Sequence, residues 1–103
     1  MNNARFTIEY AESVGDDLTR LRAYERAQIL DTVEEQLTYT PTQETRNRKP
    51  LFGLIPPWEH VEPVWELRIG EYRIFYDVDE AVSVVTVRAI RHKPPHKTME
   101  EIL

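Results

Sequence analysis

Two arginines lie in the segment with the clearest pattern in the chain. Residues 65–78 alternate apolar and polar side chains on both sides of Gly70, which predicts two strands joined by a tight turn. Side chains of a strand point alternately to two faces, so Glu66, Arg68 and Arg73 are expected together on the open face, away from the core. Two guanidinium groups on an open face suit an anion such as phosphate. The alternative is cross-strand pairing with acidic neighbours.

Positive charge gathers in the second half of the chain, although the net charge of the 103 residues is −5. Residues 1–45 hold nine acidic and four basic residues, whereas residues 46–103 hold nine of each. The acidic balance argues against a protein that coats nucleic acid, but a local basic patch can still bind phosphates by releasing counterions. The candidate phosphate-binding residues outside the hairpin are Arg46, Arg48, Arg88, Arg91 and Lys93.

The composition excludes several functional classes. The chain has no cysteine, which excludes disulfides, thiolate metal sites and a cysteine nucleophile. Its apolar runs are short and it begins without a basic-then-apolar leader, so we expect no membrane span or signal peptide and predict a cytoplasmic protein. With 41% hydrophobic residues, residues 1–103 are expected to form one domain with a modest core. We expect no metal ion and no small-molecule cofactor.

Periodicity places a strand and two helices in the first 40 residues. Residues 5–10 alternate and predict a strand. Ser13 and Asp16 have the spacing of a capping box, which predicts that a short helix starts near Ser13. A second helix is expected to end before Pro41, because proline donates no backbone hydrogen bond. Its apolar stripe is expected to be Ala27, Leu30, Val33 and Leu37.

The rest of the chain predicts a long loop and a third strand of a meander. Residues 40–63 contain five prolines and are interpreted as an ordered loop. Residues 82–90 predict a strand with Val85, Val87 and Ala89 on one face and Val84, Thr86 and Arg88 on the other. A final helical turn or two is expected within residues 97–103. The predicted class is α+β, with an N-terminal strand, an α-helical hairpin and a three-stranded antiparallel meander in one sheet packed on the helices.

Two stretches carry a resemblance to a known family. They are Pro-Thr-Gln-Glu-Thr-Arg-Asn-Arg-Lys-Pro-Leu at 41–51 and Trp-Glu-Leu-Arg-Ile-Gly-Glu-Tyr-Arg-Ile-Phe-Tyr-Asp-Val at 65–78. With the order of elements around them, the chain resembles the RelE/ParE toxins of bacterial type II toxin–antitoxin systems over nearly its whole length. For RelE-like members the resemblance implies the RelE-like fold and a ribonuclease that enters the ribosomal A site and cuts messenger RNA without a metal.

The resemblance also implies roles for individual residues. Arg73 matches the hairpin arginine that acts on the scissile phosphate, and Arg68 matches a basic position on the preceding strand. Lys49 falls near a position that holds a base or a phosphate ligand in some relatives. Arg91, His92 and Lys93 fall where relatives place a further catalytic cation or a histidine.

The chain departs from the family pattern at its end. Many ribonucleolytic relatives carry a tyrosine after the last strand, whereas this chain has no tyrosine after Tyr76. His92 is the candidate general acid or base in its place, since a histidine side chain can both donate and accept a proton near neutral pH. The missing tyrosine also leaves two alternatives open: a ParE-type toxin that poisons DNA gyrase without chemistry of its own, and an inactive toxin fold that binds an antitoxin.

All three hypotheses imply one common partner. The resemblance implies a cognate antitoxin encoded by the adjacent gene, whose partly acidic disordered segment is expected to cover Arg68, Arg73 and Arg91. The ribonuclease hypothesis adds the ribosome and messenger RNA. No membrane partner is expected.

Overall fold

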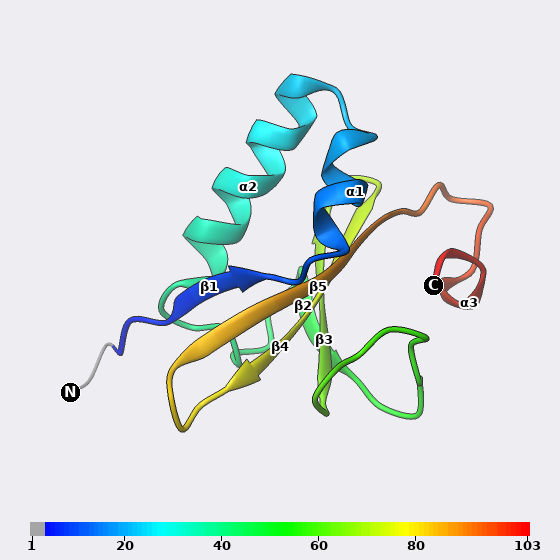
Figure 1. Ribbon diagram of the computed structural model, residues 1–103. Helices are drawn as coiled ribbons and strands as arrows, with labels where there is room; N and C mark the ends of the chain where they lie inside the picture. The colour runs from blue at the N-terminus through cyan, green and yellow to red at the C-terminus, as the bar shows by residue number, and fades with distance from the viewer. Residues whose placement is uncertain (1–3) are drawn as a thin grey trace.

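The computed structural model describes residues 4–103 and shows two helices on one side of a sheet (Figure 1). Helix α1 (Val14–Thr19) and helix α2 (Ala23–Leu37) form the predicted hairpin, and helix α3 (Met99–Ile102) is the predicted C-terminal turn. Ser13 precedes α1, but its side chain makes no capping hydrogen bond. Its backbone is already helical, whereas a capping residue is normally extended. The predicted capping box was therefore wrong.

The sheet has five strands in the order β1-β5-β4-β3-β2. They are β1 (Thr7–Tyr10), β2 (Arg48–Leu51), β3 (Val64–Ile69), β4 (Tyr72–Asp79) and β5 (Val84–His92). Strand β1 runs parallel to β5, and the other neighbours are antiparallel. The predicted α+β class and meander are confirmed. The expectation of loop throughout residues 40–63 was wrong, because β2 lies within it; Pro50 is tolerated there because β2 is an edge strand.

One face of the sheet packs on the helices. Helix α2 buries Ile29, Val33 and Leu37, a stripe at spacings of four. The expected stripe was partly wrong, since Ala27 is exposed and Leu30 only partly buried. The sheet residues buried against this stripe and α1 are Trp65, Leu67, Ile74, Tyr76, Val85, Val87 and Ile90.

The other face of the sheet is covered as well. Val64, Phe75, Ala89 and Ile102 form a second buried cluster. Partly buried side chains from the end of β2, from the segment after it and from the C-terminus pack against this cluster, namely Leu51, Trp58, Met99 and Leu103. As a result, Glu66 is 3% exposed and Arg73 8% exposed. The prediction that both stand on an open face was wrong, because these two segments fold over it.

An irregularity in the pairing of β4 and β5 changes which side chains share a face. Phe75 is the partner of Ala89, but the next residue, Tyr76, is the partner of Val87, so β5 carries one extra residue, Arg88. A single extra residue reverses the alternation beyond it. Ala89 therefore lies in the second cluster, not beside Val85 and Val87 as expected.

Within residues 4–103, no helix has the length and apolar character needed to cross a membrane.

The half-buried Tyr10 should make the fold sensitive to alkali. Burial, and then the charge of Glu34, raise the pKa of its phenol to about 12, from 10.0. The folded state then holds this proton more tightly than the unfolded state, so the stabilisation is complete below pH 10 and is lost as the pH rises to 12. We predict that the free energy of unfolding of Tyr10→Phe falls by about 1 to 2 kcal/mol less than that of the native chain between about pH 9 and 12, as measured by urea unfolding. The exposed control Tyr39→Phe should leave the slope unchanged; equal slopes for Tyr10→Phe and the native chain would contradict the prediction.

Candidate functional site: a row of arginines

Three arginines form a row across the meander. Arg68 on β3 is the direct partner of Arg73 on β4, and Arg73 is in turn the partner of Arg91 on β5. Residues directly opposite each other in antiparallel strands point to the same face, so the three side chains leave the sheet on one face, and the Arg91 guanidinium then reaches Asp17 on α1. Like charges in this arrangement repel, which makes the row a cost to the fold.

Arg73, at the centre of the row, is held by the end of its own hairpin. Its Nη1 donates hydrogen bonds of 2.9 Å to the carbonyl oxygens of Gly70 and Tyr72. Its Nε lies 3.4 Å from Glu66 Oε2, which is close enough for an ion pair but without hydrogen-bond geometry. Burial, and then the neighbouring charge of Arg68, lower the pKa of Arg73 from its usual value. Burial and the charge of Arg68 therefore disfavour the charged form of Arg73.

Arg91 is held by a carboxylate and an aromatic ring. Its Nη1 donates to both carboxylate oxygens of Asp17, at 3.1 and 3.0 Å. Asp17 also accepts a hydrogen bond of 3.0 Å from the backbone N–H of Ile90, which ties α1 to β5. The Arg91 guanidinium carbon lies 5.1 Å from the centre of the Trp58 ring, within the range of a cation–π contact. Arg91 is therefore fixed on two sides.

Further cations lie near the row. The backbone N–H of Arg68 donates to the Asn47 carbonyl at 2.8 Å, so the turn that carries Arg46 adjoins Arg68. Lys49 on β2 is the direct partner of Glu66 and shares its face. Lys93 follows β5, and its backbone N–H bonds to the Glu71 carbonyl. Within the described part of the chain, no carboxylate forms an ion pair with Arg46, Lys49, Arg68 or Lys93.

Arg48 and Arg88 do not join the row. Arg48 is 5% exposed, and its Nη1 donates to the carbonyls of Gln36 and Thr40, where it caps the end of α2. Arg88 donates to Asp77 at 2.8 and 3.3 Å, and Asp77 also accepts from the backbone N–H of Val61. Both arginines thus hold neighbouring segments in place.

His92 lies on the opposite face from the row. It is the partner of Tyr72, and its ring lies 5.2 Å from the Tyr72 ring on the side of the helices. Its Nε2 is 2.9 Å from Glu71 Oε1. The structure therefore does not bring His92 together with Arg68, Arg73 and Arg91.

The residues that hold the row were not identified as such from the sequence. Asp17 contacts Arg91 across 74 positions, and no local pattern reports a contact of that separation. The covered position of Trp58 depends on the path of the segment after β2. Only Glu66 gave a signal, since its alternation placed it on the same face as Arg73.

The arrangement is suited to hold a phosphate. Guanidinium groups present planar pairs of donors that match two phosphate oxygens and stay charged at neutral pH. Arg68 is exposed at the end of the row, while Arg73 and Arg91 are oriented by contacts within the chain. An anion on this surface would offset the repulsion between neighbouring arginines.

If the row is kept for binding, removal of one charge should stabilise the protein. We predict that Arg68→Gln raises the free energy of unfolding by about 0.2 to 1 kcal/mol at low salt, because a neutral side chain at this position no longer repels Arg73. The gain should shrink in about 1 M salt, which screens charges more than about 3 Å apart. Urea unfolding at both salt concentrations measures it, with the exposed Arg5→Gln as control. A loss of stability at low salt would show that Arg68 is structural.

Comparisons with known proteins agree with this fold. A model for the ParE toxin of the type II toxin–antitoxin system parDE matches residues 8–93. A search of curated protein sequences gave no significant match.

Solved toxin structures share the fold at low sequence identity. The RelBE2 toxin–antitoxin complex from Mycobacterium tuberculosis has a TM-score of 0.67 at 22% identity, over 86% of this chain and 99% of the other. The RelE–RelB complex from Pyrococcus horikoshii gives 0.67 at 19% identity, over 91% and 99%. The isolated RelE toxin from E. coli gives 0.65 at 17% identity, over 93% of each chain. The match of the family model over most of the chain shows that this protein belongs to the RelE/ParE family, as a toxin of a type II toxin–antitoxin system.

Proposed function

We propose that this toxin binds messenger RNA at the arginine row and cleaves it on the ribosome. The observation that carries the proposal is the in-register alignment of Arg68, Arg73 and Arg91 on one face of three neighbouring strands. A fold keeps like charges on adjacent strands at a cost, as the effect of the Arg68 charge on Arg73 indicates, and such local conflicts are typical of functional sites. The resemblance of the hairpin to RelE-like toxins supports RNA as the source of the phosphate.

The row can lower the barrier to cleavage by electrostatics. In this step the ribose 2′-OH gives its proton to water and attacks the adjacent phosphorus, and the P–O5′ bond breaks as the 5′ oxygen takes a proton from water. Negative charge builds on the phosphate oxygens in the transition state. Arg73 is already oriented by two carbonyl oxygens, so it needs little reorganisation to meet that charge. Arg68 is exposed and can contact the same phosphate, and we propose that Arg46, Lys49 and Lys93, which lie near the row, bind the flanking backbone.

The structure supports proton transfer by His92 less well than charge stabilisation by the row. His92 lies across the sheet from the row and is engaged with Glu71. We therefore propose that cleavage depends mainly on positioning and charge stabilisation by the row, with the ribosome holding the substrate in line. On this proposal His92 is not the general acid or base.

The proposal predicts which substitutions matter. Arg68→Ala should lower cleavage of ribosome-bound messenger RNA by about 100-fold, in line with the loss of one donor to a developing oxyanion. His92→Gln should retain cleavage within about threefold, and Lys97→Ala, in the exposed C-terminal segment, is the matched cation control. Primer extension on programmed ribosomes measures all three. Full cleavage by Arg68→Ala, or intact transcripts with excess native protein, would overturn the proposal.

A gyrase-binding toxin without chemistry is the second candidate. It is favoured by the ParE family model and by the pairing of Arg73 and Arg91 with Glu66 and Asp17, which leaves these arginines less free for a substrate. The same protein preparation in a supercoiling assay separates the two candidates. Inhibited gyrase together with intact transcripts would assign this second function.

We also propose that the chain binds a cognate antitoxin, as the toxins in the two RelB–RelE complexes do. An acidic antitoxin segment across Arg68 and the cations beside it would neutralise the row. Co-purification with the product of the adjacent reading frame tests this, and Arg68→Glu should weaken the complex.

A further inference from the structure

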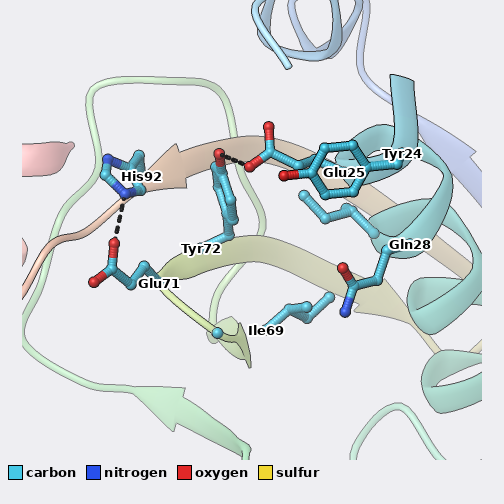
Figure 2. Close-up of a pocket in the computed structure, with 9 residues that line it drawn as sticks. Tyr24, Glu25, Gln28, Ile69, Glu71, Tyr72 and His92 are labelled. Carbon is cyan, nitrogen blue, oxygen red and sulfur yellow. Dashed lines mark hydrogen bonds and ion pairs between the residues drawn. The ribbon is translucent and has the colours of Figure 1, made fainter. Parts of the chain in front are cut away.

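A pocket of about 280 Å³ opens on the helix face, on the other side of the sheet from the arginine row. It lies between the first turns of α2 and the turn that joins β3 to β4 (Figure 2). Helix α2 contributes Tyr24, Glu25, Gln28 and Ile29, and the sheet contributes Ile69, Gly70, Glu71, Tyr72 and His92. The cleavage proposed above uses none of these side chains.

Two carboxylates give the pocket a negative charge. Glu25 accepts hydrogen bonds from the Tyr72 hydroxyl and from the backbone N–H of Arg22, each of 3.2 Å. Glu71 is 2.9 Å from His92 Nε2. A carboxylate has about four acceptor positions, so both groups keep capacity for a further donor. No lysine or arginine among the described residues lines the pocket.

Aromatic rings form the rest of the wall. Tyr24 is 64% exposed, and nothing in the core requires so large an apolar ring at this position. The Tyr72 and His92 rings lie 5.2 Å apart and are inclined by 48°. Burial, followed by the hydrogen bond to Glu25, raises the pKa of Tyr72, which keeps its hydroxyl protonated as a donor to that carboxylate. Figure 2 shows Glu25 at the Tyr72 hydroxyl on one side of the Tyr72 ring and the Glu71–His92 pair on the other.

We propose that this pocket binds an arginine side chain presented by a polypeptide partner. Carboxylates beside exposed aromatic faces are the groups that recognise organic cations. A guanidinium fits better than an ammonium, because it is planar, stacks on rings and can donate two parallel hydrogen bonds to one carboxylate. The lining offers no lysine or arginine to hold the carboxylate of a free amino acid, and its histidine is engaged with Glu71, so the arginine is expected to arrive within a chain.

The pocket proposal is independent of how the toxin acts on its target. The pocket and the row lie on opposite faces of the same sheet, and they have opposite charge. A partner that occupies the pocket can therefore bind while the row is free. If the protein fails to cleave RNA, arginine binding at the pocket can still be tested, and the reverse also holds.

The test is an NMR titration of the full ¹⁵N-labelled chain with N-acetyl-arginine-N-methylamide. The backbone amides of Gln28, Gly70 and Glu71 should shift together, and the neutral isostere N-acetyl-citrulline-N-methylamide should leave them unchanged. Glu25→Gln should weaken binding about tenfold, because it removes a charged acceptor. Glutamine still accepts from the Arg22 N–H, so α2 keeps its first turn.

Matched controls keep the outcome clear. Glu35→Gln removes an exposed carboxylate from α2 outside the pocket and should bind as the native chain does. Tyr24→Ala, at an exposed position, should weaken binding without loss of the folded spectrum. Equal shifts with the citrulline and arginine probes, or no shift at the three amides, would overturn the proposal. Tighter binding of free L-arginine than of the blocked form would assign the pocket to a small molecule instead of a polypeptide.

Discussion

The extra residue in β5 determines which side chains form the site. Thr86, before Arg88, pairs with Asp77 and faces away from the helices. If the alternation continued without interruption, residues 90 and 92 would also face away from the helices. The bulge reverses this order, so that Arg91 joins Arg73 on the outer face and His92 turns to the helix face. One inserted residue thus separates a candidate phosphate site from a carboxylate-lined pocket. The Arg88–Asp77 ion pair holds the bulge, with Asp77 also bonded to Val61.

Contacts from outside the sheet and from within it offset the repulsion along the row. Asp17 approaches Arg91 from α1, and Trp58 approaches from the segment after β2. Glu66 adjoins Arg73 on the sheet itself. These contacts stabilise two of the three arginines, and Arg68 remains exposed at the end. The segment that carries Trp58 also covers the second apolar cluster, so the packing of this face and the orientation of Arg91 depend on each other.

Local patterns in the sequence were sufficient for most of the fold. The alternation around Gly70, the helical spacing before Pro41 and the valine-rich run each specify their own element from neighbouring residues. Strand β2 was missed because Pro50 and the surrounding prolines are typical of a loop, and its pairing with Trp65 is non-local. The reversed faces after Arg88 were missed for a related reason, since a bulge is set by the partner strand. For the site, the row could be anticipated at Arg68 and Arg73, whereas the contact of Arg91 with Asp17 could not.

The central claim is that the arginine row is the anion-binding surface of this toxin. The most direct measurement records the side-chain Nε–H signals of the arginines by NMR during titration with a short single-stranded RNA in which every ribose is 2′-O-methylated, so that it binds without being cleaved. The account predicts that the signals of Arg68, Arg73 and Arg91 shift together and that those of Arg48 and Arg88, which are engaged elsewhere, stay in place. Shifts confined to Arg48 or Arg88, or no shift in the row at saturating oligonucleotide, would contradict it.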